Sequence, residues 1–232
     1  MNRIDEVYTK RPVFGARRMK AQLKRKFGFA VGRKLVRKLM QVMGLEAIYS
    51  RPKTSLPHPD HQVFPYLLTN ITASHPNHIW GTDITYVKAA GTWFYLVAML
   101  DWYSRYVISW LLSDSLESDF CVANLQMALA TAVPDYHNSD QGSQFTSAAY
   151  LGVLRQHPDI KISMDGRGRC HDNIFTERLW RTVKYEEVYL RDYASFAEAK
   201  QSLKHFFRDY NHDTPHQSLN YQTPAELYFG QS

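Results

Sequence analysis

Apolar residues recur every three to four positions in the first fifty residues, which predicts short helices rather than strands. Met19, Leu23 and Phe27 lie four residues apart and predict a helix over 15–27. A shorter helix is predicted over 3–12, because the proline at its end cannot continue a helix. The start of the chain is therefore expected to be all-helical.

A third helix is predicted over 33–43, with an apolar side, a basic side and Gly44 as its C-terminal cap. A helix, a glycine-containing turn and a basic helix form the outline of a helix-turn-helix. A basic amphipathic helix is also typical of a helix that only faces solvent. The apolar side consists of Leu35, Val36, Leu39, Met40 and Met43, and the basic side consists of Arg33, Lys34, Arg37 and Lys38.

A proline-rich stretch separates this segment from the rest of the chain. Four prolines lie between residues 50 and 65, and this composition predicts an extended linker over 51–70. We therefore expect a small helix-turn-helix-like, DNA-binding segment at 1–50 and a second domain at 71–232.

The second domain has the pattern of an α/β fold. Strands are predicted at 79–88, 93–102 and 106–112, close enough in sequence to favour an antiparallel meander. Helices and strands then alternate, which indicates a mixed sheet with helices on its faces. The later elements are predicted as a helix at 117–133, a strand at 136–139, a helix at 143–157, a strand at 160–164, a helix at 173–188 capped by Asp172, and a helix at 196–210.

The net charge of +6 conceals a strong asymmetry. Residues 1–60 contain 15 Lys and Arg against 4 Asp and Glu, a balance of +11, whereas residues 61–232 contain 13 against 18, a balance of −5. A compact basic segment joined to a mildly acidic body is typical of a polyanion-binding arm, although a lysine-rich soluble surface gives the same count.

Several classes of protein are disfavoured. No apolar run is long enough to span a bilayer, and the charged N-terminus lacks the apolar centre of a signal peptide. The two cysteines, Cys121 and Cys170, lack the spacing of a zinc site and are too few for a disulfide framework. We expect a cytoplasmic, nucleoid-associated protein with no membrane partner.

Three acids far apart in sequence are placed where strands or helices could direct them to one point. Asp83 is predicted in the middle of an apolar strand, where a charge is costly unless it is paired or metal-bound. Asp140 ends a short strand, and Glu177 lies in the first turns of a helix. Three converging carboxylates can hold two divalent ions about 4 Å apart, the arrangement used to cut and join phosphodiesters.

The Glu177 helix carries further candidates on the same face. Asn173, Arg181 and Lys184 lie at i−4, i+4 and i+7 from Glu177, so two cations could hold phosphates beside a metal ligand. Oxygen-only ligands favour Mg²⁺, or Mn²⁺ as a substitute, over zinc. Against this hypothesis, residues 61–232 contain eighteen acids, and helical Glu–Lys spacings commonly form ordinary surface pairs.

Long stretches of the chain resemble one family. Residues 77–228 resemble the catalytic core of insertion-sequence transposases related to retroviral integrases, and residues 4–50 resemble the helix-turn-helix segment that precedes this core. The stretches that carry the resemblance are Trp80–Val87, LDWYSRYVIS at 100–109, NSDQGSQFTS at 138–147, SMDGRGRCHDNIFTERLWR at 163–181 and YNHDTPHQSLNYQTPAEL at 210–227.

The resemblance implies a ribonuclease-H-like fold. It implies that Asp83, Asp140 and Glu177 are the catalytic acids of a DDE-type transposase, and that Lys184 contacts DNA near the cut. It further implies DNA ends and target DNA as partners, assembly as a homo-oligomer on DNA, and a helix-turn-helix protein or fusion supplied by an upstream reading frame.

The chain departs from the family pattern in its spacing. It leaves 36 residues between Asp140 and Glu177, one more than is usual, and the extra residue falls near 157–159. The segment 130–136 is a few residues short, and Thr214 stands where the family generally has Arg. Two other hypotheses remain open: a truncated or inactive DNA-binding regulator or relic of such an element, and a structure-selective nuclease on the same fold.

Overall fold

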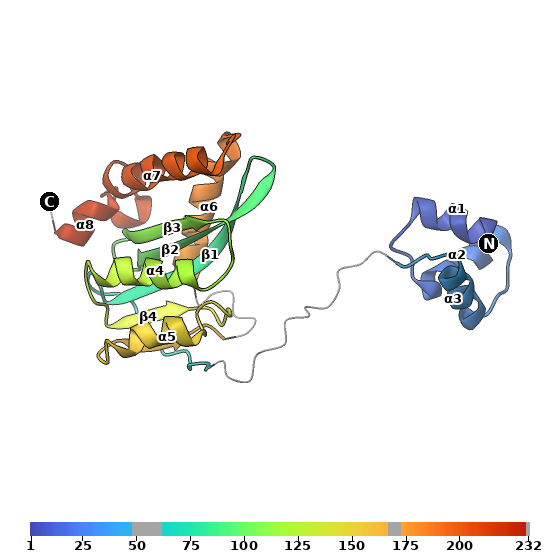
Figure 1. The fold of residues 1–232 in the computed structure, drawn as a ribbon, viewed down its shortest axis with the longest axis horizontal. Helices are drawn as coiled ribbons and strands as arrows, with labels where there is room; N and C mark the ends of the chain where they lie inside the picture. The colour runs from blue at the N-terminus through green and yellow to red at the C-terminus, as the bar shows by residue number, and fades with distance from the viewer. Residues whose placement is uncertain (48–61, 167–172, 231–232) are drawn as a thin grey trace. The chain divides into compact units, whose positions relative to one another are not determined.

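The computed structural model of this 232-residue chain describes residues 1–47, 62–166 and 173–230. Its internal contacts divide the chain into two compact units, Met1–Leu56 and Pro57–Ser232. Each unit is described by itself, and Figure 1 shows the elements of both. No helix in the described part of the chain is both long and apolar enough to cross a membrane.

The N-terminal unit is a bundle of three short helices, as the sequence predicts. The helices α1 (Asn2–Lys10), α2 (Ala16–Phe27) and α3 (Arg33–Val42) begin and end within two residues of the expected positions. Their small core consists of Ile4, Val7, Met19, Leu23, Val36 and Met40.

One residue of the predicted apolar side of α3 is misplaced. Leu35 is 49% exposed, because it lies next to the buried stripe formed by Val36 and Met40 rather than within it. The N-terminal unit therefore presents an apolar side chain beside the exposed basic side of α3.

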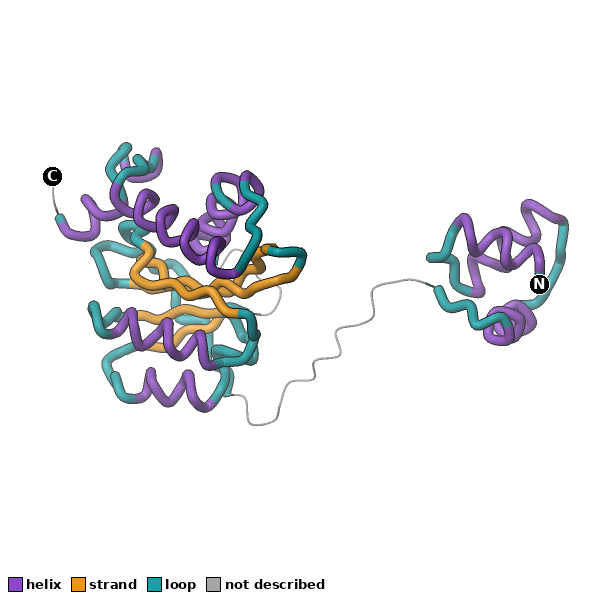
Figure 2. The backbone as a smooth tube through the Cα atoms, turned by 45° about the horizontal axis from the view of Figure 1, so that its top comes forward, coloured by secondary structure: helices purple, strands orange, loops and turns teal. Residues whose placement is uncertain are grey.

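The second unit is built on a five-stranded mixed sheet with the strand order β3-β2-β1-β4-β5. The first three strands form the expected antiparallel meander, and β4 and β5 continue the sheet in parallel with β1. Figure 2 shows these strands between helical layers. The strands are β1 (Ile79–Ala89), β2 (Thr92–Asp101), β3 (Val107–Ser113), β4 (Tyr136–Ser139) and β5 (Lys161–Met164).

The pairing of β1 with β4 is short. It covers only Ile79–Gly81, whereas β2 follows β1 from Trp80 to Ala89. Within the described residues, the half of β1 that starts at Asp83 therefore has no strand partner on the β4 side.

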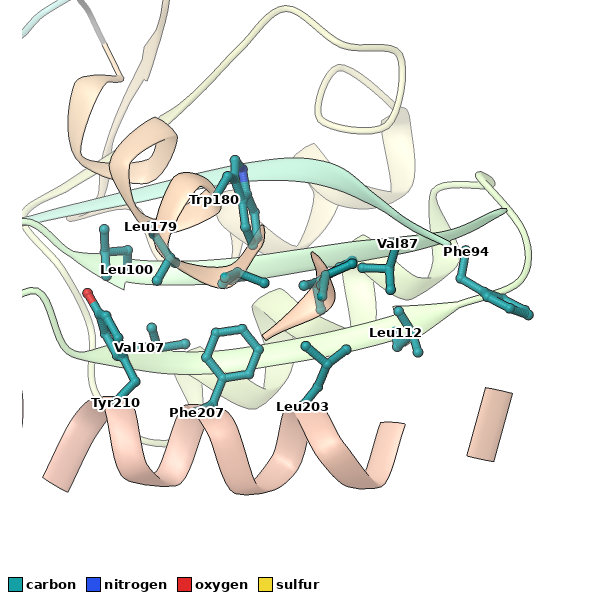
Figure 3. Close-up of a cluster of buried hydrophobic side chains, with 14 of the residues drawn as sticks. Val87, Phe94, Leu100, Val107, Leu112, Leu179, Trp180, Leu203, Phe207 and Tyr210 are labelled. Atoms are coloured by element: carbon teal, nitrogen blue, oxygen red, sulfur yellow. The ribbon is translucent and has the colours of Figure 1, made fainter. Parts of the chain in front are cut away.

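Two separate hydrophobic cores fill the two faces of the sheet. One core packs α6 (Ile174–Glu186) and α7 (Phe196–His212) on the sheet, and Figure 3 shows Leu203, Phe207 and Tyr210 of α7 directed at the strands. The other core packs α4 (Asp119–Leu129) and α5 (Ala148–Arg155) on the opposite face. The predicted helix–sheet–helix architecture is confirmed.

Several predicted boundaries are wrong. The helix expected at 117–133 is only Asp119–Leu129, and the helix expected at 143–157 starts at Ala148, because Ser147 caps it by accepting a hydrogen bond from Tyr150 N. Asn173, not Asp172, occupies the N-cap position of α6, and Asp172 itself lies outside the described residues.

Two parts of the chain were not anticipated. A final helix, α8 (Pro224–Phe229), begins at a capping box formed by Thr223 and Glu226. Part of the stretch expected as linker packs on the second unit: Leu68 is buried, and Leu67 N donates a hydrogen bond to Ser163 Oγ at 3.1 Å.

Candidate active site

Asp83 lies on β1 at the sheet face covered by α6. Its Oδ2 accepts a hydrogen bond from Trp180 Nε1 at 3.0 Å. Burial, followed by the negative charge of Asp140 and, more weakly, that of Glu177, raises the pKa of Asp83 to about 6. The three acids predicted from the sequence are therefore electrostatic neighbours.

Asp140 directly follows β4, where the strand leaves the sheet. The N–H of Gly142 donates to Asp140 Oδ1 at 2.8 Å, and a Cβ at position 142 would lie only 2.8 Å from the same oxygen. Burial of the carboxyl group raises the pKa of Asp140, although the residue keeps solvent-accessible surface. Gly142 thus holds the Asp140 carboxylate in a position that any side chain would disturb.

Glu177 lies on the exposed side of the first turns of α6. The start of this helix is tied to β1, because Asn173 Nδ2 donates to Thr82 O at 3.3 Å and Thr176 Oγ1 donates to Asn173 Oδ1 at 2.5 Å. These bonds place the helix of Glu177 beside the strand of Asp83.

Gly81 makes this close approach possible. A Cβ at position 81 would lie 2.1 Å from Trp102 Nε1 and 3.0 Å from Thr176 Oγ1, so no side chain fits there. Arg105 supports the same helix start, since its guanidinium lies 3.5 Å from the centroid of the Phe175 ring. Burial lowers the pKa of Arg105 to about 10.

The carboxylates are near one another but do not converge fully. Potential metal ligands within 4.8 Å of one another are found, among the described residues, at His75, His78 and Asp135. The three acids are not part of this group. Within the same described residues, no Lys, Arg or His nitrogen lies within 4.0 Å of Asp83, Asp140 or Glu177. In the described part of the chain, the site therefore has clustered negative charge that no ion pair balances.

This arrangement suits divalent cations. Carboxylate oxygens are ligands that Mg²⁺ prefers, and a bound cation would offset the repulsion that raises the pKa of Asp83. Among the residues that the structure describes, neither a cysteine nor a histidine joins this group of acids, and carboxylate oxygens alone favour Mg²⁺ over zinc. Cys121 is buried, and burial raises the pKa of its thiol to about 12, so it is not a reactive nucleophile.

The cationic candidates lie at the surface. Lys184 is half-buried on α6, and Arg181 is exposed with its guanidinium 6.0 Å from the centroid of the Tyr185 ring. The four basic residues of α3, Arg33, Lys34, Arg37 and Lys38, are all exposed. The geometry leaves all six side chains free to contact a polyanion.

Comparison with known families gives three matches along the chain. Residues 73–170 and 158–224 match models described as "Integrase core domain", and residues 1–53 match a model described as "HTH-like domain". Among curated proteins, the chain is 31% identical over 230 residues to the putative transposase InsK for insertion sequence element IS150 of Escherichia coli (strain K12), which covers 97% of this chain and 81% of that protein.

Further relatives and solved structures agree with these matches. The transposase for insertion sequence element IS904 of Lactococcus lactis is 30% identical over 214 residues, covering 86% of this chain and 81% of that protein. The HTLV-2 integrase catalytic core domain in complex with magnesium superimposes with a TM-score of 0.56 at 21% identity, over 68% of this chain and 99% of that one.

The fold is therefore the ribonuclease-H-like fold of retroviral integrase cores, preceded by a helix-turn-helix-like unit. The sequence identity to the curated transposases and the two integrase-core matches also identify the family. The chain belongs to the insertion-sequence transposases that have an integrase core domain.

Sequence reasoning missed the residues that hold the acids in place. Trp180, Gly81 and Arg105 all lie within the stretches that resemble the family, yet nothing in their local pattern predicts a contact with the site. Each makes its contact across a large sequence separation, as Trp180 does with Asp83, which is 97 positions earlier in the chain.

Proposed function

We propose that this protein is a DDE-type transposase in which Asp83, Asp140 and Glu177 are the catalytic acids. Three observations support the roles of these residues: the negative charges of Asp140 and Glu177 both act on the half-buried Asp83, the acids have no cationic partner among the described residues, and each acid is positioned by its own element. The family supports the reaction class, a polynucleotidyl transferase acting on DNA.

The three acids would hold two divalent cations, Mg²⁺ or Mn²⁺ as its substitute. Such a pair stabilises the attacking and leaving oxygens of a phosphodiester exchange. The chain itself positions the acids through Gly142, Trp180 and the anchored start of α6. Lys184 would hold a phosphate a few nucleotides from the cut, because it lies two turns along the helix from Glu177.

Two reactions would use this site in turn. In the first, water attacks a phosphodiester at the element end and a 3′-hydroxyl leaves. In the second, this 3′-hydroxyl attacks a phosphodiester of the target, so one P–O bond forms as another breaks. No covalent bond between protein and DNA is required, so none of the tyrosines or serines needs to act as a nucleophile.

Asp83→Asn tests the catalytic role most directly. We expect it to lower Mg²⁺-dependent cleavage and strand transfer at least roughly 1000-fold, because removal of one ligand forfeits several kcal/mol of transition-state stabilisation. The assay uses purified full chain, DNA carrying the element ends, and Mg²⁺ or Mn²⁺. Undiminished strand transfer by the variant would rule out this mechanism, and binding without any nicking by wild type would favour a regulator.

The basic side of α3 is proposed to supply affinity through phosphate contacts. Replacing Arg33, Lys34, Arg37 and Lys38 with Gln should weaken DNA binding and reduce the salt slope by about 0.9 per lost contact. A matched control replaces four exposed cations of α2, Arg17, Lys20, Lys24 and Arg25, with the same change in charge. Equal effects of the two variants would show that α3 contributes only general charge.

A further inference from the structure

The hairpin formed by β1 and β2 presents exposed aromatic rings close to the proposed site. Tyr86 faces Tyr95 directly across the hairpin, with ring centroids 5.4 Å apart, and the ring of Trp93 stands perpendicular to that of Tyr86 at 6.4 Å. Trp93 is 56% exposed and Tyr86 is 51% exposed. Large aromatic side chains are rarely left in water in such a group without a partner.

These rings border a pocket of about 810 Å³. The end of α6 and the segment after it form its other side, with Lys184, Tyr189 and Arg191. Three cations, including Lys88, line the pocket against the single acid Asp192. The pocket is thus both aromatic and positively charged, with a volume suitable for one nucleotide.

The distance to the catalytic acids can be judged along α6. Glu177 and Lys184 are seven residues apart on this helix, which corresponds to about 10.5 Å along the axis. A nucleic-acid strand advances about 3.4 Å per nucleotide, so the pocket lies roughly three nucleotides from Glu177.

The edge of the sheet allows a strand to reach both places. Asp83 and Tyr86 are three residues apart on β1, so their side chains lie on opposite faces of the sheet. Within the described part of the chain, β1 has no strand partner on the β4 side beyond Gly81. A DNA strand bound at both places would therefore have to pass along this part of β1, from one face of the sheet to the other.

We propose that this pocket binds an unpaired nucleobase of the DNA strand held at the active site, about three nucleotides from the scissile phosphate. The proposal rests on the proposed function and identifies a substrate subsite for it. Aromatic rings stack on bases without regard to sequence, and neighbouring cations hold the phosphates. An apolar peptide would supply no anion to Lys88 and Lys184, which have no ion pair among the described residues, whereas Arg191 already lies 3.7 Å from Glu187.

Binding of single-stranded DNA tests the subsite without any cleavage. The probe is an oligothymidylate of about 12 nucleotides, compared by fluorescence anisotropy with an abasic oligonucleotide of the same length, which keeps the phosphates but lacks the bases. We expect the full-length chain to bind the oligothymidylate about tenfold more tightly than the abasic oligonucleotide. Both probes offer the same phosphates to the basic N-terminal unit, so a difference between the probes reports contacts with the bases.

Trp93→Ala should reduce this preference to near unity and leave affinity for the abasic oligonucleotide unchanged. The matched control is Phe229→Ala on α8, since Phe229 is similarly exposed, at 54%, and lies outside the pocket. Trp93 is also a spectroscopic probe. Trp80, Trp102 and Trp180 are buried and Trp110 is partly buried against Phe207, so base stacking should quench chiefly the emission of Trp93. Because Trp93 is exposed, the alanine variant should keep its fold, which circular dichroism checks.

Equal binding of the two probes by wild type, or an unchanged ratio in Trp93→Ala, would overturn the proposal. A change in oligomeric state on sedimentation without a change in the ratio would assign the patch to a protein contact instead. The test is independent of catalysis: a wild type that never cuts DNA but retains the Trp93-dependent preference would contradict only the proposed reaction.

Discussion

Two aspartates in the β1–β2 pair differ in their hydrogen bonds and in the charges near them. Asp101, at the end of β2, accepts hydrogen bonds from Asn77 N at 2.7 Å, Ser104 N at 2.7 Å and Ser104 Oγ at 2.6 Å. Asp83, on β1, accepts one side-chain hydrogen bond, from Trp180, and lies near two further acids. Both carboxyl groups have a raised pKa, and burial is the main cause in each case.

The contrast separates an acid that serves the fold from the acid that we propose is catalytic. Asp101 is saturated with donors that join β2, the turn after it and the segment before β1, so its charge serves the fold. Asp83 has spare acceptor capacity and like charges beside it, which costs stability and is useful only when a cation is held there. Hydrogen-bond saturation thus distinguishes two acids that sequence position alone does not.

The largest expected effect on stability comes from Asp101→Asn. The amide NH₂ would face donors that now bind a carboxylate, so we expect a loss of about 2 kcal/mol in the free energy of unfolding. Asp83→Asn should leave stability equal or higher, because it removes a charge that is repelled by its neighbours. Urea unfolding of both variants measures the two changes in stability. Equal destabilisation would show that Asp101 and Asp83 do not differ in their contribution to the fold.

Gly142→Ala should reduce strand transfer about 100-fold while binding of DNA persists. The new Cβ would lie 2.8 Å from Asp140 Oδ1, so the carboxylate must move, and displacement by about 1 Å can cost that much in rate. The control is Gly152→Ala on α5, where no atom lies within 4 Å of the added Cβ and helix propensity favours Ala. Comparable activity of the two variants would show that the position of Asp140 is not critical.

A smaller effect is expected from pH. The pKa of Asp83 is about 6 in the folded chain and about 3.9 in an unfolded one, so the folded state binds more protons between these values. Stability without divalent cations should therefore fall as pH rises from about 4 to about 6, and then level off.

Variants at two positions sharpen this test. Asp83→Asn should flatten the fall in stability with pH. Trp180→Phe should extend this fall to higher pH, because the hydrogen bond from Trp180 lowers the pKa of Asp83 and its removal raises that pKa. Trp110→Phe serves as the control, since Trp110 stacks on Phe207 rather than on an acid. Thermal unfolding in a chelator gives the melting temperature at each pH. Identical profiles for wild type and Asp83→Asn would place the titration elsewhere.

Much of the fold could be predicted because its signals are local. The alternation over β1, the apolar run of β2 and the helical spacing of α2 each arise from neighbours in sequence. The limits of α5 were missed because Ser147 caps the helix, which places Ser143–Thr146 in turns. α8 was missed although Thr223 and Glu226 carry its capping signal.

The residues of the candidate site could be predicted from the sequence, but the way in which they are held together could not. The motifs name Asp83, Asp140 and Glu177, and their roles remain proposals. The acids are held by hydrogen bonds between segments that are distant in sequence, such as those from Trp180 to Asp83 and from Asn173 to Thr82. No periodicity or spacing contains that information, because it depends on how α6 approaches β1.

The turn between α5 and β5 is where the sequence predicts one residue more than the family pattern has. Pro158 and Asp159 are exposed there, between the buried side chains of Leu154 and Ile160. An additional residue at this surface turn leaves both flanking elements anchored, and the start of α6 is fixed separately by Asn173. An insertion at this exposed turn should therefore leave the proposed site intact, and an epitope or fluorophore inserted at Pro158 would be a practical label for following assembly.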